Sequence, residues 1–319
     1  MNAAVVQVDG LIFDYPTQRA LFGVDCRVDR GTITALVGPN GAGKTTLMRC
    51  MAGLEMPFAG SVVVAGLDVL ADPRRAHKHM GFLQDFFGLY DDLSVRHCLE
   101  FHAAANGIAP AGRRQAVERT AERLNLRDRL DQRAGTLSRG LRQRLAIAQA
   151  IIHEPDVVLL DEPAAGLDPE ARESLSQLLR TLSASGMTLI VSSHILSELE
   201  DYSTHMLILR DGRVVEHCPI SGEPAALRQL RLVLSEPVDD LAATLAARHG
   251  VDGVLLTGAT VASFGFAGDL AAQRRLLADL IGSGLPVAGL AEEVRPMQQV
   301  YRDRLRKDGP QANQERWSA

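Results

Sequence analysis

The sequence Gly38-Pro39-Asn40-Gly41-Ala42-Gly43-Lys44-Thr45 gives the clearest indication of the protein's architecture. It fits the phosphate-binding pattern of Gly, four residues, then Gly-Lys-Thr, and it lies between a predicted strand, 32–37, and a predicted helix, 44–52. The glycines would let backbone N–H groups surround phosphate oxygens, while Lys44 would reach the β- and γ-phosphates and the Thr45 hydroxyl would ligate Mg²⁺. A plain glycine-rich turn that caps a helix is the alternative. Because the chain has only three lysines, a lysine at this position favours the phosphate loop.

A second apolar run, 157–160, ends in two acidic residues, Asp161 and Glu162. In a parallel sheet, ligands bind at the carboxyl ends of the strands, so both carboxylates would face the phosphates. Asp161 is expected to hold Mg²⁺ through water, and Glu162 to polarise an attacking water as general base. By itself, the pair also fits an acidic strand end that faces solvent. The phosphate-loop pattern favours the first interpretation.

Composition limits the class of protein. The 319 residues are 46% hydrophobic and 23% charged, which is typical of one large globular domain or two unequal ones. A net charge of −5 gives no electrostatic argument for a nucleic-acid partner, and none is expected. Apolar runs are too short to span a bilayer and residues 1–7 lack the features of a signal peptide, so we expect a cytoplasmic protein. The four cysteines lack paired spacing, which indicates reduced thiols.

The order of predicted elements indicates an α/β fold with a helical insertion. Strands 5–13, 21–28 and 32–37 come first, 94–150 is mostly helical, and strands 156–160 and 188–192 flank helix 169–183. Asp211-Gly212 predicts a tight hairpin turn between strands 205–210 and 213–216. We therefore expect a first domain over residues 1–218, with a helical subdomain at about 85–150.

Turn-forming residues at 219–224 predict a domain boundary. The elements expected beyond it are strand 230–234, helix 238–248, strands 253–257 and 261–266, helix 269–282 and strand 287–290. This βαββαβ order predicts a small α+β, ferredoxin-like domain over 219–307. A last helix is expected at 293–307 and a frayed tail at 308–319. The sequence does not choose whether this domain regulates, dimerises or contacts a partner.

Three motifs together resemble the nucleotide-binding subunit of ATP-binding cassette (ABC) transporters. They are Gly38–Thr46, Leu137-Ser138-Arg139-Gly140-Leu141 and Leu159–Pro163, in that order. The resemblance covers Val5 to about Cys218, and it implies a P-loop NTPase fold with a mixed sheet, an antiparallel β subdomain and a helical subdomain. It also implies that ATP binds Gly38, Pro39, Asn40, Gly41, Ala42, Gly43, Lys44, Thr45 and Thr46, with Tyr15 stacked on the adenine. Without the resemblance, Tyr15 is expected to be a surface tyrosine at a strand end.

The second motif resembles the family signature, commonly Leu-Ser-Gly-Gly-Gln, from which Arg139 and Leu141 depart. Such departures are typical of drug-exporter-type ATPases. The resemblance implies that Ser138 and Gly140 contact the γ-phosphate bound by the opposite subunit. Taken alone, the segment predicts a helix that Ser138 caps.

Three further positions gain a role only through the resemblance. Gln84, after strand 80–83, matches the glutamine that senses Mg²⁺ and the attacking water. His194 matches the switch histidine, which contacts the γ-phosphate. Asp168 lies in a segment that resembles the loop crossing the dimer interface. Taken alone, these residues would be a loop glutamine, a strand-end histidine and a helix N-cap before Pro169.

The resemblance implies an ATP-binding and ATP-hydrolysing subunit of an exporter. Two copies would close around two MgATP and act on a separate polytopic permease from the cytoplasmic face of the membrane. A regulatory or translation-related soluble ABC ATPase remains the alternative, although translation factors of this family normally carry two cassettes. A chromosome-maintenance ATPase would need a long coiled coil, for which the segment between Gln84 and Leu137 leaves no room.

Two surfaces are candidates for contact with other molecules. Between Arg113 and Arg144 the sequence has ten arginines and four acidic residues, which predicts either a solvated helical face or a surface near anionic lipid or the permease. Phe86-Phe87-Gly88-Leu89-Tyr90 is the stronger docking candidate, because clustered aromatic residues commonly anchor interfaces. The transported substrate would be set by the permease.

Overall fold

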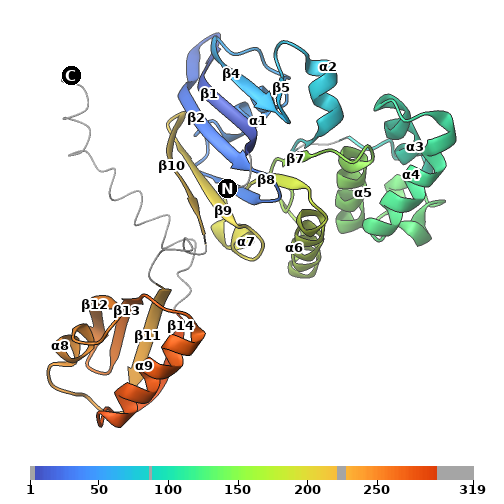
Figure 1. Cartoon of the computed structure of the whole chain (residues 1–319). Helices are drawn as coiled ribbons and strands as arrows, with labels where there is room; N and C mark the ends of the chain where they lie inside the picture. The colour runs from blue at the N-terminus through green and yellow to red at the C-terminus, as the bar shows by residue number, and fades with distance from the viewer. Residues whose placement is uncertain (1–3, 86–87, 221–227, 293–319) are drawn as a thin grey trace. The chain divides into compact units, whose positions relative to one another are not determined.

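The protein is described by a computed structural model that covers residues 4–85, 88–220 and 228–292 (Figure 1). It forms two compact units that separate after Ile220, within the 219–224 segment rich in turn residues. Phe86 and Phe87 of the predicted docking segment, the predicted helix 293–307 and the tail 308–319 lie outside the described residues. None of the helices in the described ranges combines the length and the apolar character that a membrane crossing requires.

A six-stranded sheet forms the centre of the first unit. Its strand order is β10-β9-β3-β8-β7-β6, and every neighbouring pair is parallel except β9 and β10. The strands are β3 (Ile33–Val37), β6 (Met80–Leu83), β7 (Val157–Leu160), β8 (Thr188–Ser192), β9 (His205–Arg210) and β10 (Arg213–Pro219). All residues of β3, β7 and β8 are buried, as expected for parallel strands covered on both faces.

An antiparallel sheet, β2-β1-β4-β5, covers part of this centre. It comprises β1 (Ala4–Tyr15), β2 (Gln18–Asp29), β4 (Ala59–Val64) and β5 (Leu67–Asp68). Its inward side chains, such as Val8 and Leu21, share one apolar core with Leu47 of helix α1 (Lys44–Met51) and Leu159 of β7. The mixed sheet and the antiparallel β subdomain are therefore confirmed.

The helical insertion is confirmed as helices α3, α4 and α5, which contact one another and lie together in Figure 1. The remaining helices of the first unit are α2, α6 and α7. The bounds of these six helices are α2 (Pro73–Ala76), α3 (Val95–Ala105), α4 (Pro110–Arg123), α5 (Arg139–Ile151), α6 (Pro169–Ala184) and α7 (Leu196–Glu200). Short 3₁₀ turns lie at His77–His79, Arg127–Arg129 and Ala134–Thr136. Ser94, Ser138 and Asp168 cap α3, α5 and α6 by accepting a backbone N–H.

Several arginines of the 113–144 segment are engaged within the chain. Arg119, Arg127 and Arg142 form ion pairs with Glu154, Glu122 and Asp91, and Arg144 donates to the carbonyl of Leu124. These contacts support a structural contribution from the basic residues. Contact with lipid or a permease stays a prediction.

The second unit has the predicted βαββαβ order. Its elements are β11 (Arg228–Leu234), α8 (Leu241–Ala246), β12 (Val251–Gly258), β13 (Val261–Phe266), α9 (Leu270–Gly282) and β14 (Val287–Glu292). The sheet order β12-β13-β11-β14 is antiparallel throughout, and α8 and α9 share one core with the strands, which is the ferredoxin-like arrangement. Helix α8 is shorter than the predicted 238–248, because Asp240 adopts a left-handed conformation (φ +52°) and the helix begins only after it.

The predicted hairpin between β9 and β10 is confirmed, and its turn contacts β2 of the antiparallel sheet and the Gly38–Thr45 loop. Asp211 and Gly212 have φ values of +49° and +70°, as a mirror-image turn requires. Gly212 donates to the carbonyl of Ala42 (3.1 Å) and accepts from the N–H of Phe22 (2.9 Å). A Cβ atom at Gly212 would overlap the Ala20 carbonyl oxygen and lie 2.7 Å from the Phe22 ring. The turn therefore joins the antiparallel sheet to the Gly38–Thr45 loop.

We expect Gly212→Ala to lower the free energy of unfolding by about 3 kcal/mol, because it adds left-handed strain to a steric overlap. Gly66→Ala is the matched control, since Gly66 has φ +79° and open space around its Cα. Only the strain, about 1 kcal/mol, should apply there. Urea unfolding of the full chain measures both values, and equal losses would contradict the described packing of the turn.

Candidate functional site

The carboxyl ends of four parallel strands bring the predicted site residues to one edge of the central sheet. Leu36 of β3 pairs with Ser192 of β8, and Leu160 of β7 pairs with Val191 of β8 and Leu83 of β6. The residues that follow these strands are the Gly38 loop, His194, the Asp161–Glu162 pair and Gln84. This edge is where an open α/β sheet binds its ligands.

The Gly38–Thr45 loop folds tightly against β9. A Cβ atom at Gly38 would overlap the carbonyl oxygen of Leu209, and Gly43 adopts φ +100° as the residue that precedes α1. Both positions therefore require glycine. Lys44 as a residue is only 8% exposed, and its ammonium donates to the carbonyls of Gly38 (2.8 Å) and Pro39 (3.1 Å).

Burial lowers the pKa of Lys44, and the carboxylates of Glu162 and Asp161 oppose this shift. The two acidic residues that follow β7 therefore lie close enough to stabilise the charged lysine. The structure thus brings the loop and the acidic pair into one electrostatic site, as the sequence predicts.

The structure also brings Tyr15 to the loop. Its hydroxyl lies 3.2 Å from the hydroxyl of Thr46, which is buried at the start of α1. The Tyr15 ring packs edge-on against Phe13, with ring centroids 4.9 Å apart. Tyr15 therefore lies beside the Gly38–Thr46 segment, where an adenine-stacking residue is expected; the stacking itself stays a prediction.

The acidic pair is held in a defined geometry. The Asp161 side chain is 2% exposed, and one of its carboxylate oxygens accepts a 2.5 Å hydrogen bond from the Ser192 hydroxyl. Glu162 adopts φ +49°, and its N–H donates to the same Ser192 oxygen (3.0 Å). The Glu162 carboxylate lies 2.8 Å from His194 Nδ1. A strained backbone and a paired carboxylate at a strand end are typical of a functional site.

Ser192 is the residue that sequence reasoning misses. It is fully buried, and its hydroxyl donates to Asp161 while accepting from the Glu162 N–H. It therefore sets the positions of both acidic residues. The one signal in the sequence is its place two residues before His194, where β8 changes from apolar to polar residues.

The donor atoms at this edge fit a magnesium ion. The Asp161 carboxylate, the exposed Thr45 hydroxyl and the Gln84 amide supply oxygen, the donor that Mg²⁺ prefers. Within the ranges described, no group of three His, Cys, Asp or Glu side chains could hold a metal by itself. Magnesium sites in nucleotide enzymes rely on few protein ligands together with phosphate and water oxygens.

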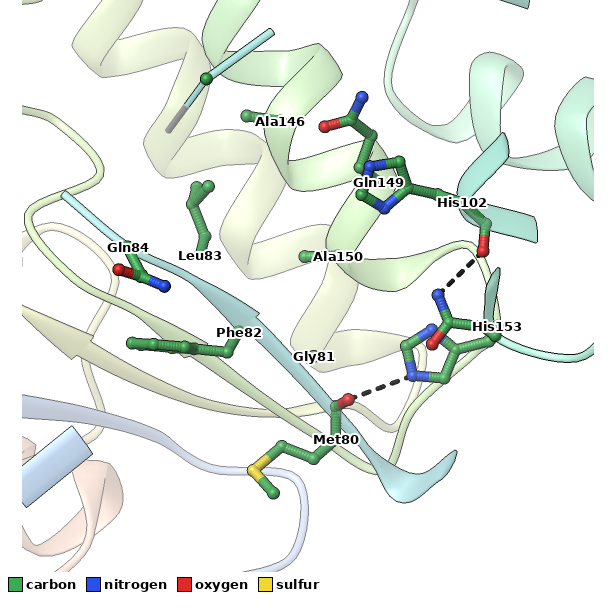
Figure 2. Close-up of a pocket in the computed structure, with 12 residues that line it drawn as sticks. Met80, Gly81, Phe82, Leu83, Gln84, His102, Ala146, Gln149, Ala150 and His153 are labelled. Carbon is green, nitrogen blue, oxygen red and sulfur yellow. Dashed lines mark hydrogen bonds between the residues drawn. The ribbon is translucent and has the colours of Figure 1, made fainter. Parts of the chain in front are cut away.

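Gln84 lies at the edge of a cavity of about 350 Å³ (Figure 2). Strand β6 and helices α3 and α5 line the cavity, with polar contributions from Gln84, His102, Gln149 and His153. Burial lowers the pKa of both His102 and His153, which favours their neutral forms. Gln84 follows Leu83, whose carbonyl accepts the Asp161 N–H at 2.9 Å. Gln84 is therefore adjacent to both the acidic pair and the cavity.

The signature-like segment lies at the start of α5, next to the loop that precedes α6. Ser138 accepts the Leu141 N–H (3.4 Å), and Arg139 donates to the Ala165 carbonyl (3.1 Å). Asp168 caps α6 by accepting the Ala171 N–H (2.8 Å). No hydrogen bond or ion pair in the described part of the chain joins residues 137–141 to the Gly38–Thr46 segment. The predicted contact with the nucleotide of an opposite subunit stays a prediction.

Comparison with known proteins identifies relatives of this chain. Residues 21–165 match the family described as "ABC transporter", and this range contains Lys44, Ser138 and Glu162. The probable multidrug ABC transporter ATP-binding protein YbhF of Escherichia coli (strain K12) is 38% identical over 231 residues. That alignment covers 72% of this chain but 39% of YbhF, so the chain spans about two fifths of that relative's length.

Two other comparisons cover most of the related protein. The Nod factor export ATP-binding protein I of Burkholderia orbicola (strain AU 1054) is 33% identical over 227 residues, which make up 71% of this chain and 73% of the relative. A solved structure described as the ATP-binding subunit of an ABC transporter aligns with a TM-score of 0.61 at 30% identity. It matches 68% of this chain and 90% of the solved chain.

We expect Ser192→Ala to lower the free energy of unfolding by about 1–3 kcal/mol and to slow ATP hydrolysis, because it leaves the Glu162 N–H and the buried Asp161 carboxylate without their shared partner. Ser176→Ala is the matched control, since Ser176 is also buried but donates only to the Arg172 carbonyl within α6. Urea unfolding and a steady-state ATPase assay measure the two effects. Equal behaviour of the two variants would contradict the role of Ser192.

Proposed function

The chain belongs to the ABC transporter family, and from this membership we propose that it is the ATP-binding and ATP-hydrolysing subunit of an exporter. The observation that carries the proposal is the meeting of Lys44, Asp161, Glu162 and His194 at one edge of the central sheet. A phosphate loop beside a buried carboxylate and a paired glutamate is suited to phosphoryl transfer to water.

Each side chain has a proposed role in hydrolysis. Lys44 and the loop N–H groups bind the β- and γ-phosphates, and Glu162 accepts a proton from the attacking water. His194, 2.8 Å from Glu162, orients that carboxylate and reaches the γ-phosphate. Thr45, Asp161 and Gln84 would hold Mg²⁺, which neutralises charge on the phosphates when bound.

The proposed working unit contains two copies of the chain. Residues 137–141 of one copy would complete the ATP site of the other, and the loop that ends at Asp168 would cross the interface. Moving an open–closed equilibrium from 1:99 to 99:1 takes about 5.5 kcal/mol. One ligand at about 100 times its dissociation constant supplies about 2.7 kcal/mol if it binds only the closed state. Two ATP molecules would therefore supply about 5.4 kcal/mol, close to the free energy required, whereas one would supply only about half of it.

Closure of the two copies would pull on a polytopic membrane permease, and hydrolysis would reset the pair. We place the subunit in the cytoplasm, at the cytoplasmic face of the membrane. One relative is named a multidrug ABC transporter ATP-binding protein, and the other is named a Nod factor export ATP-binding protein. The export direction is therefore part of the proposal, whereas a transported compound is not.

We expect Glu162→Gln to bind ATP but to accumulate as a closed dimer, because the site keeps its phosphate contacts and loses its general base. Lys44→Ala should lose nucleotide binding. Glu173→Gln, an exposed change of the same kind in α6, serves as the control. Size-exclusion chromatography with MgATP and a steady-state ATPase assay provide the readouts. A monomeric Glu162→Gln variant with unimpaired turnover would show that the role assigned to Glu162 is wrong.

The permease requires a separate test. Affinity capture of the full chain from membranes of the source organism, followed by mass spectrometry, should recover a polytopic membrane protein. Captures that contain soluble proteins alone would favour the regulatory or translation-related alternative.

A further inference from the structure

We propose that Arg139 is a positioning residue that fixes the loop between β7 and α6, and that it thereby couples the two ATP sites of the dimer. The inference rests on the proposed function, because it assumes a dimer in which each signature segment faces the partner's ATP. It assigns a role in the same subunit to a side chain that stands where the common signature has glycine.

The contact between Arg139 and this loop is close. The Arg139 guanidinium donates to the Ala165 carbonyl through Nη2 (3.1 Å) and covers the next residue, Gly166. A Cβ atom at Gly166 would overlap the guanidinium group, and Gly166 also adopts φ +67°. Residue 166 can therefore carry no side chain while Arg139 holds this position.

Backbone hydrogen bonds connect this loop to Glu162, the proposed general base. The Ala165 N–H donates to the Glu162 carbonyl (3.1 Å), and the Leu167 N–H donates to the Ala164 carbonyl (3.2 Å). These two bonds close two overlapping tight turns, 162–165 and 164–167. Arg139 contacts Ala165 and Gly166, in the middle of this segment. Glu162 itself is in a left-handed conformation (φ +49°), so its orientation depends on the turn that follows it.

This path gives α5 a mechanical connection to Glu162. In the proposed dimer, Ser138 at the start of α5 contacts the partner's ATP, whereas Glu162 acts on the ATP bound by its own chain. A shift of Ser138 would be transmitted through Arg139 and Ala165 to Glu162. The planar guanidinium can bond the Ala165 carbonyl with one nitrogen while its other atoms occupy the space beside Gly166, which a compact ammonium group cannot do.

The first experiment measures ATP hydrolysis by the full chain as a function of ATP concentration. Arg139→Ala should lower kcat about fivefold, the factor expected for one net hydrogen bond, and bring the Hill coefficient towards 1. The dissociation constant of Arg139→Ala for ATP should stay within twofold of that of the unaltered chain. Arg139→Lys should recover only part of the loss, and Arg133→Ala, which removes the same charge from an exposed position nearby, should resemble the unaltered chain.

A double-mutant cycle tests the contact itself. Gly166→Ala should reduce kcat strongly in the unaltered chain and much less in the Arg139→Ala background, because the overlapping guanidinium is then absent. The left-handed strain at residue 166 is the same in both backgrounds and cancels. Equal losses in the two backgrounds would overturn the proposal.

Other outcomes are equally decisive. The proposal is wrong if Arg139→Ala matches Arg133→Ala in kcat and Hill coefficient, or if it loses ATP affinity in proportion to kcat. If Arg139→Ala does not fold, Arg139→Lys decides: reduced cooperativity at an unchanged melting temperature supports the role, and unchanged cooperativity overturns it. An unaltered chain that hydrolyses no ATP would instead refute the proposed function.

Discussion

The Lys44 ammonium, on a residue that is only 8% exposed, makes the contacts on which the other site residues depend. Its hydrogen-bond partners are two carbonyl oxygens of its own loop, and the nearby carboxylates of Asp161 and Glu162 favour its charged state. Burying a cation costs free energy unless polar groups surround it, and a loop of this shape can supply them only because Gly38 and Gly43 allow close backbone approach. The strands that deliver the loop and the acidic pair must therefore end at the same sheet edge, which the parallel pairing of β3, β8 and β7 ensures.

A second layer of contacts connects this edge to the helical subdomain. Ser192 fixes both acidic residues, and Glu162 then leads into two turns that Arg139 holds from the start of α5. Under the proposal, the helical subdomain influences the orientation of Glu162 through Arg139. In the proposed dimer, this arrangement makes hydrolysis at one site responsive to the occupancy of the other.

Much of this fold could be predicted from local sequence patterns. The strand–loop–helix at Gly38–Thr45, the Asp211-Gly212 hairpin and the βαββαβ order depend on turn chemistry and periodicity, which neighbouring residues specify. Ser192 and the Arg139–Gly166 contact could not be predicted, because each joins segments far apart in the chain. Helix α8 begins later than the sequence predicts, because two consecutive acidic residues give no sign that Asp240 is left-handed.

In the proposed dimer, each ATP lies between Lys44 of one chain and Ser138 of another. The most direct measurement is an experimental structure of the full-length Glu162→Gln variant with MgATP. We expect a two-fold symmetric dimer with two ATP molecules, each in contact with Lys44 of one protomer and Ser138 of its partner. ATP bound at Lys44 in a chain whose Ser138 faces only solvent would contradict it.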